Sequence, residues 1–241
     1  MISYKSKNTY FIKHTPRMPF NIRFGLLFVF VILLHNLPIY AQDEVYCGTD
    51  AVEHEKLLHQ PNYAHQVQVM NQQIEDATLN LWARRDAGLV SRDSDEMDVV
   101  SIPVVVHIMH APGQSVGSGS NISDQQVYNA IEHLNQAYRN QLAYDPTSGV
   151  DLQMEFCLAS RTPEGNYTNG ITRSPSFNNV DLAANGNNLT MKSSTAWNQT
   201  QYLNIWVTGS IAKSDEGINN IAGYSSYASE HGTTNDGLIC R

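Results

Sequence analysis

Cysteine is scarce in this chain of 241 residues, which contains only Cys47, Cys157 and Cys240. A small, odd number of thiols excludes a disulfide-rich scaffold, so a hydrophobic core must hold the fold together. The chain also lacks H-E-x-x-H, the helical signature of many zinc peptidases. His54 and His59 are five positions apart, which turns the second ring about 140° from the first on a helix. The sequence therefore predicts exposed polar residues at this point and no zinc site.

Long apolar runs are also missing, since a helix needs about 20 apolar residues to span a bilayer. The longest run, FGLLFVFVILL, covers residues 24–34. Basic residues precede it and LPIYA follows, which is typical of a secretory signal peptide. We therefore predict a signal over residues 1–41, cleaved near Ala41–Gln42, and a secreted or cell-surface protein without a membrane partner. An uncleaved membrane anchor is the alternative.

Basic residues are too few for a nucleic-acid partner. The chain has 15 Lys and Arg against 23 Asp and Glu, a formal net charge of −8. Residues 1–41 hold five of the basic residues and no acidic ones, so the charge without them is −13. Nucleic acid requires a basic patch. This balance therefore excludes nucleic acid as an expected partner.

Hydrophobic periodicity divides the rest of the chain into a helical part and an α/β part. Residues 42–98 show helical spacing, with a helix expected over 66–85 and a polar linker after it. SIPVVVHIMH, at 101–110, is typical of a strand buried on both faces. The helix that follows begins with a capping box of Ser123 and Gln126. Its apolar stripe consists of Val127, Ala130, Ile131, Leu134, Ala137 and Tyr138.

Further strands are expected over residues 150–160, 202–210, 222–228 and 236–240. The segment at 222–228 is polar and aromatic, as in an exposed edge strand. The Asn-rich stretch at 162–200 predicts a long surface loop with little regular structure. A strand–helix–strand unit with a right-handed crossover predicts a three-layer α/β fold with a mostly parallel sheet and an antiparallel edge strand.

The order of these segments resembles the pappalysin-like (cytophagalysin) zinc metallopeptidases, a metzincin family. The resemblance is carried by CGTD, HEKLLHQPNY, IPVVVHIMH, NISDQQVYNAIEHLNQAYRN, EFCLASRTPEGNYTNGITR, YLNIWV, AGYSSY and DGL, in that order. It implies a secreted zinc metalloendopeptidase that acts on peptides or proteins. Residues 42–98 would be a pro-segment and linker, and 99–241 the N-terminal subdomain of the catalytic domain.

The resemblance also implies what this chain does not contain. In the family, H-E-x-x-H-x-x-G-x-x-H follows the segment that matches DGL, and this chain ends before such a motif. We therefore expect zinc in a full-length parent, none bound to this chain, and no activity of this chain alone. A half-domain would expose the face that the rest should cover, so marginal stability and aggregation are expected.

Two candidate sites follow from the resemblance. Cys47, followed by Gly48, resembles the cysteine switch of metzincin zymogens, in which a pro-segment thiolate takes the fourth zinc position. Cys47 is thus the one candidate metal ligand, for the latent form. A thiol without a role, or one half of an intermolecular disulfide, is the alternative. In metzincins the strand that matches AGYSSYA forms the upper rim of the cleft, where substrates add as a strand. The candidate substrate-backbone contacts are Gly223, Tyr224, Ser225, Ser226 and Tyr227. An ordinary edge strand is the alternative.

The remaining histidines predict structural roles. His107 and His110 are three apart on a strand and so point to opposite faces, where they cannot share a metal. His133 should lie at the solvent edge of its helix, and His231 lies in a Gly-rich loop.

The strands that carry Cys157 and Cys240 should not be neighbours, by resemblance to metzincin sheets. Their Cα atoms would then be too far apart for a disulfide. We expect Cys157 to be a free, half-buried thiol.

Two other interpretations of function remain open. One is an exported, non-catalytic module that binds peptides or a surface partner, and the other is an inhibitory pro-segment fragment. The codons after Arg241 would distinguish them from a peptidase.

Overall fold

The structure is a computed structural model that describes residues 46–89, 99–142, 144, 149–183 and 186–241. Contacts divide the chain into Met1–Gln42 and Asp43–Arg241, and the described residues all belong to the second unit. The predicted signal peptide and most of the predicted linker lie outside the described residues.

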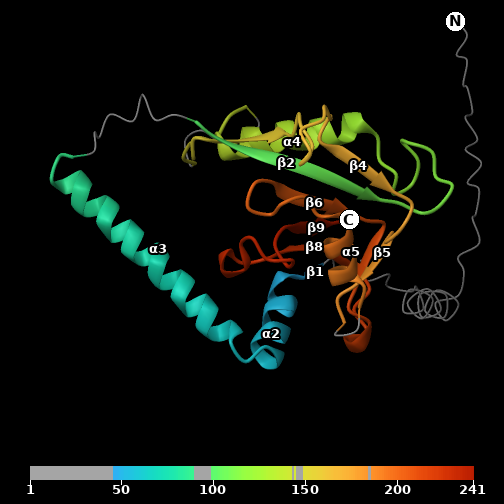
Figure 1. Cartoon of the computed structure of the whole chain (residues 1–241), viewed down its shortest axis with the longest axis horizontal. Coiled ribbons are helices and arrows are strands. Elements are labelled where there is room, and N and C mark those ends of the chain that lie inside the picture. Colours follow the sequence, from blue (N-terminus) through green and yellow to red (C-terminus); the bar gives the residue numbers. More distant parts are fainter. Residues whose placement is uncertain (1–45, 90–98, 143, 145–148, 184–185) are drawn as a thin grey trace, which may run out of the picture. The chain divides into compact units, whose positions relative to one another are not determined.

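A seven-stranded sheet forms the centre of the second unit, in the strand order β1-β8-β9-β6-β2-β3, with β4 also paired to β2 (Figure 1). The strands are β1 (Tyr46–Cys47), β2 (Val100–Met109), β3 (Met154–Leu158), β4 (Ile171–Ser174), β6 (Leu203–Val207), β8 (Ile221–Ser225) and β9 (Leu238–Cys240). Among these described strands, only the β8–β9 pair is antiparallel. The predicted α/β class with a mostly parallel sheet and an antiparallel strand near one edge is confirmed.

The helices and a small second sheet complete the fold. The helices are α2 (Thr49–His59), α3 (Tyr63–Asp86), α4 (Asp124–Tyr138) and α5 (Asn188–Thr195), with 3-10 turns η2 (Ser214–Glu216) and η3 (Ala228–Glu230). In the second sheet, β5 (Asn179–Asp181) pairs in parallel with β7 (Ser210–Ala212). Within the described residues, no helix combines the length and apolar character needed to cross a bilayer.

The prediction of little regular structure over 162–200 is wrong, because β4, β5 and α5 lie there. These elements have three to eight residues each, too few for a clear apolar period. A few buried residues anchor β5 and α5: Val180 in β5, and Met191 and Lys192 in α5. Tertiary packing, which local sequence does not reveal, determines this region.

One face of the sheet packs against α4. Val104, Val106 and Ile108 of β2 form this core together with Phe156 of β3 and Val127 of α4. The predicted capping box is present in full, with reciprocal bonds at the helix start. Most of the predicted stripe packs here, whereas Ala130 is exposed. The capping box and the apolar periodicity of the sequence therefore predicted α4 and most of the side chains that it packs against the sheet.

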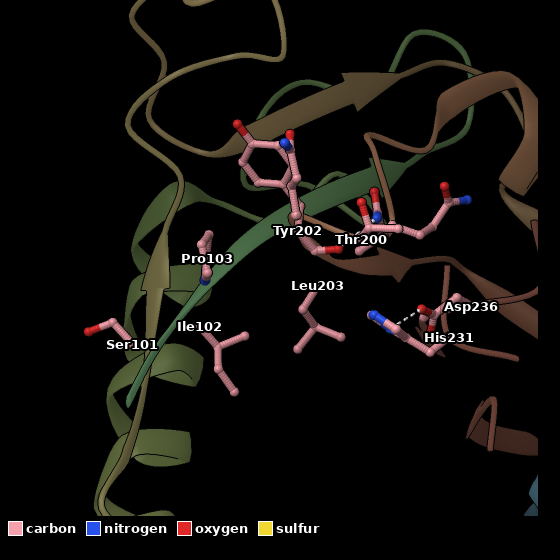
Figure 2. Close-up of a pocket in the computed structure, with 12 residues that line it drawn as sticks. Ser101, Ile102, Pro103, Thr200, Tyr202, Leu203, His231 and Asp236 are labelled. Carbon is pink, nitrogen blue, oxygen red and sulfur yellow. Dashed lines mark hydrogen bonds and ion pairs between the residues drawn. The ribbon is translucent and has the colours of Figure 1, made fainter. Parts of the chain in front are cut away.

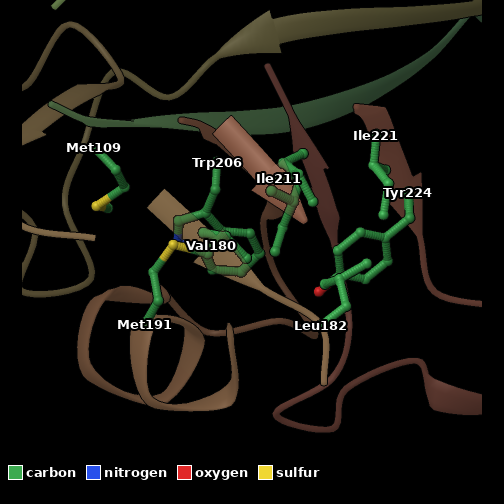
Figure 3. Packing of buried hydrophobic residues seen from close by; sticks show 9 residues of the cluster. Met109, Val180, Leu182, Met191, Trp206, Ile211, Ile221 and Tyr224 are labelled. Atoms are coloured by element: carbon green, nitrogen blue, oxygen red, sulfur yellow. The ribbon is translucent and has the colours of Figure 1, made fainter. Parts of the chain in front are cut away.

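The opposite face packs against α5 and the small sheet, which makes the third layer. Trp206 is fully buried there, and Figure 3 shows its ring above Met191 and close to Val180. Ile221 and Tyr224 of β8 belong to the same cluster. Strand β8 is therefore anchored in this core through its inward-pointing side chains.

Candidate functional site

The predicted edge strand β8 is covered by the segment that carries Cys47. Strand β1 pairs with β8 in parallel, with Cys47 opposite Gly223. The Gly48 amide donates a hydrogen bond to the Gly223 carbonyl at 2.9 Å, and the Ser225 amide donates to Thr49 Oγ1 at 3.2 Å. The prediction of an exposed edge is therefore wrong in this structure. The composition of β8 suits an edge, but nothing local indicates that a distant segment pairs with it.

Gly48 allows this close approach. A Cβ atom on Gly48 would lie 2.9 Å from Ile221 Cγ2 and 3.4 Å from both Leu182 Cδ1 and Tyr224 Cβ. The backbone of Gly48 has φ −82°, which any residue can adopt. Glycine is therefore required at this position because there is no room for a side chain, and not because of the backbone conformation.

Cys47 is a free, exposed thiol that donates a weak hydrogen bond to Thr49 Oγ1 at 3.5 Å. The described residues contain no group of three or more His, Cys, Asp or Glu side chains that could hold a metal ion. They do not fit a catalytic zinc, which needs three protein ligands. The role of Cys47 as a metal ligand stays a prediction.

The five candidate rim residues divide between the strand and the loop after it. Gly223, Tyr224 and Ser225 lie in β8, while Ser226 and Tyr227 follow it. The Tyr224 ring points into the core, its hydroxyl accepts a hydrogen bond from Asn188, and burial raises the pKa of that hydroxyl. Tyr224 therefore offers only its backbone to a peptide.

Sequence reasoning missed the ion pairs that hold α2 to the rest of the unit. Lys213 is buried and bonds to Glu55 at 3.2 Å and to Glu216 at 2.6 Å. The Lys213 hydrogen bond is the main cause of the lowered pKa of Glu55. Lys56 pairs with the buried Glu230 of η3. Charged residues on a helix usually face solvent, so no pattern in the sequence marked these pairs.

Tyr63, at the start of α3, completes this contact. Its side chain is buried, and its hydroxyl donates to Glu53 at 2.6 Å. Burial and this hydrogen bond raise the pKa of the hydroxyl. Strand β1 and α2 pack on the rest of the unit, whereas α3 contacts η3 only through its first turns, because residues 71–86 are all exposed.

The histidines of β2 and of the segment after it are buried. His107 bonds to Thr172 at 2.7 Å and to Asn204 at 2.9 Å, and it stacks on Trp206 at 5.3 Å. Burial lowers its pKa to about 4, so the ring is neutral at physiological pH. His110 is buried and bonds to the Ala111 carbonyl. These contacts agree with structural roles.

The other histidines lie at the surface. His54, His59 and His133 are exposed, as predicted. His231 lies beside a cavity of about 330 Å³ whose walls include Ile102 and Leu203 (Figure 2). The ring nitrogen Nδ1 lies 3.1 Å from Asp236 Oδ2, and the same oxygen accepts the Gly232 amide. Asp236 thus orders the loop that carries His231. Among the described residues, no third metal-ligating side chain is grouped with His231 and Asp236.

The two remaining cysteines are unpaired, as predicted. Cys157 lies on β3 and Cys240 on β9, with β6 and β2 between them. Cys157 is exposed, however, which corrects the expected half-burial. Its neighbour Phe156 is buried in the α4 core, so Cys157 faces the opposite, uncovered side of an edge strand. Burial raises the pKa of the Cys240 thiol.

Comparisons with known proteins add a relation to peptidases. No family model and no curated protein matches the chain. The chain is similar to a point mutant of Tannerella forsythia promirolysin, with 27% identity over 80% of this chain and 58% of that one, at a TM-score of 0.51. It also matches mirolysin in complex with compound 9, with 31% identity over 60% of this chain and 53% of that one, at a TM-score of 0.47.

A third match is mature T. forsythia mirolysin in complex with a cleaved peptide, with 28% identity over 60% of this chain and 53% of that one, at a TM-score of 0.44. The chain thus spans a little over half the length of these solved structures. Mirolysin is a metallopeptidase. The mixed α/β fold is similar to that of promirolysin, which supports a relation to metallopeptidases.

Proposed function

We propose that the protein acts in extracellular proteolysis as the latent form of a zinc metalloendopeptidase of the pappalysin-like type. Residues 46–89 act as its pro-segment and cover β8, the strand along which a peptide substrate binds. The observation that carries this proposal is the pairing of Cys47 and Gly48 with Gly223. The similarity to promirolysin, named as a pro-form, supports the same arrangement.

The covering segment and a substrate exclude each other on physical grounds. A peptide that adds to a sheet edge binds through the main-chain groups of that edge. The Gly223 carbonyl already accepts the Gly48 amide, and the Ser225 amide already donates to Thr49. A peptide can use these groups only after the segment has left. The ion pairs of α2 with Glu230 and Lys213 hold the segment in place.

Zinc enters this proposal through the family resemblance alone. Cys47 lies on β1, next to β8, and is the residue of this chain that would bind zinc in the latent form. The rest of the metal centre would come from residues outside those described.

Binding of peptides to the intact chain tests the covering role. Gly48→Val places methyl groups against Ile221 and should release the segment from β8. Leu58→Val is the matched control, because it introduces the same side chain at an exposed position of α2. Labelled extended peptides should bind the Gly48→Val chain, as measured by fluorescence polarisation, and should bind neither the parent chain nor the control. Equal binding to all three would contradict the covering role.

Hydrolysis separates a peptidase from a binding module. The native secreted gene product with Gly48→Val should cleave peptides before any processing, and a zinc chelator should stop the cleavage. Peptide binding without chelator-sensitive cleavage would refute the peptidase and support a non-catalytic peptide-binding module.

A further inference from the structure

A buried charge pair joins the N-terminal helices to the loop beyond the rim strand. The ammonium of Lys56 pairs with the Glu230 carboxylate, and the two residues are 174 positions apart in the sequence. The Lys56 side chain is 12% exposed and that of Glu230 4%. A carboxylate this buried needs a cationic partner and hydrogen bonds to offset its lost hydration. With residues 46–89 in place, Glu230 thus lies where it requires a cation.

The subdomain itself supplies the second contact to this carboxylate. The Asn235 side-chain amide donates to Glu230 Oε1 at 2.7 Å, which leaves Oε2 for the ammonium. Lys56 also lies over the Tyr63 ring at 5.5 Å, but Tyr63 belongs to the same N-terminal segment as Lys56. We call Glu230 and Asn235 the ammonium seat, because they remain when that segment leaves.

The nearby cation is already engaged elsewhere. Lys192 is buried, donates to the Asn235 carbonyl, and lies over the rings of Trp206 at 5.4 Å and Tyr224 at 5.2 Å. Burial, and then repulsion from Lys56, lower its pKa to about 8. These contacts hold the Lys192 ammonium against the Trp206 and Tyr224 rings of the core. Lys192 attracts Glu230 through space, but its printed hydrogen bond goes to Asn235, so Glu230 Oε2 loses its ammonium donor once Lys56 is gone.

The position of the seat connects it to the peptide-binding edge. Strand β8 ends at Ser225, and η3, which carries Glu230, begins at Ala228. A crevice of about 200 Å³ lies between α2 and the subdomain, lined by Lys56 and Asn235 among others. A side chain from a peptide on β8 would approach the seat at the carboxyl end of the strand.

We propose that Glu230 and Asn235 form a recognition site for a lysine side chain, occupied by Lys56 in this structure. Once residues 46–89 leave, the site takes a lysine of a peptide bound along β8. The exchange with a substrate rests on the proposed function. The affinity of the ammonium seat for an alkylammonium ion does not depend on the proposed function.

Chemical rescue in the full chain tests the seat directly. Lys56→Ala empties it, and n-butylammonium replaces the missing side chain. The ion should raise the Tm of Lys56→Ala in a saturable way, by about 4 °C at ten times its Kd. It should not raise the Tm of the parent or of Lys56→Ala combined with Glu230→Gln. Sodium chloride at equal ionic strength and n-butanol are the controls for charge screening and for apolar binding.

A second variant covers the case that Lys56→Ala does not fold. Lys56→Met keeps most of the apolar stem, and methylammonium then replaces only the charged end. Absence of rescue in both variants, or equal rescue when Glu230 is Gln, would overturn the proposal. An equal effect of the neutral alcohol would also overturn it.

Peptide selectivity of the processed native product tests the substrate role. Glu230→Gln should reduce the preference for lysine-containing over norleucine-containing peptides about tenfold in kcat/KM. An unchanged preference would contradict this role of the seat. Rescue by alkylammonium in a protein without peptidase activity would refute the proposed function while leaving the ammonium seat intact.

Discussion

The neutral, buried imidazole of His107 predicts a specific dependence of stability on pH. Burial lowers its pKa from 6.5 to about 4 in the folded chain. The unfolded chain therefore binds more protons between these values, so protonation favours unfolding as the pH falls. The stability that the neutral ring contributes is present above pH 6.5 and is lost progressively as the pH falls toward 4.

The magnitude follows from the two pKa values. A tenfold change in proton affinity corresponds to about 1.4 kcal/mol, so the full loss below pH 4 is about 3 kcal/mol. At pH 5 the loss is about 2 kcal/mol by the same linkage. Burial outweighs the hydrogen bond to Asn204, which by itself favours the charged ring, and Trp206 covers the face of the ring.

Urea unfolding of the full chain at pH 7 and pH 5 measures the effect. Other groups also titrate in this range, so the relevant quantity is the difference between the parent and His107→Gln. The parent should lose about 2 kcal/mol more than the variant between the two pH values. Equal losses in the two proteins would show that His107 does not titrate as a buried neutral group.

Three further predictions concern packing, capping and thiol access. Met191→Ala should lower the free energy of unfolding by about 3 kcal/mol, because Met191 is fully buried, whereas Leu189→Ala in the same helix should change it by less than about 0.5 kcal/mol. Ser123→Ala should cost about 1 kcal/mol through loss of the capping box, and an unchanged urea midpoint would contradict that role. In the native chain Cys157 should react with a thiol reagent within the mixing time and Cys240 far more slowly, as read by mass spectrometry; equal rates would contradict their different burial.

Local features of the fold could be predicted from the sequence. The β-branched run of β2 and the capped, amphipathic α4 each follow from residues close in the chain. The prediction that Cys157 and Cys240 lie on strands that are not neighbours is also confirmed, because it depends only on the order of the main strands. The short elements between residues 171 and 195 were missed, since each depends on one or two residues that pack against distant strands.

The candidate site could be predicted only in part. Composition and resemblance pointed to Cys47 with Gly48 and to the strand at Gly223. That these two segments pair with each other has no local signal, because a two-residue strand shows no periodicity. The Lys56–Glu230 pair was missed for a related reason, since a lysine and a glutamate far apart in the sequence read as ordinary surface charges.

Amide hydrogen exchange at Ser225 tests most directly whether residues 46–89 cover the edge of β8 along which we propose that peptides bind. In the parent chain this amide donates to Thr49 Oγ1 on the outer side of β8. NMR should show slow exchange at Ser225 in the parent and in Leu58→Val, and fast exchange in Gly48→Val, while the Ile239 amide in β9 stays slow in all three. Fast exchange at Ser225 in the parent chain would show that the edge is open and would contradict the account.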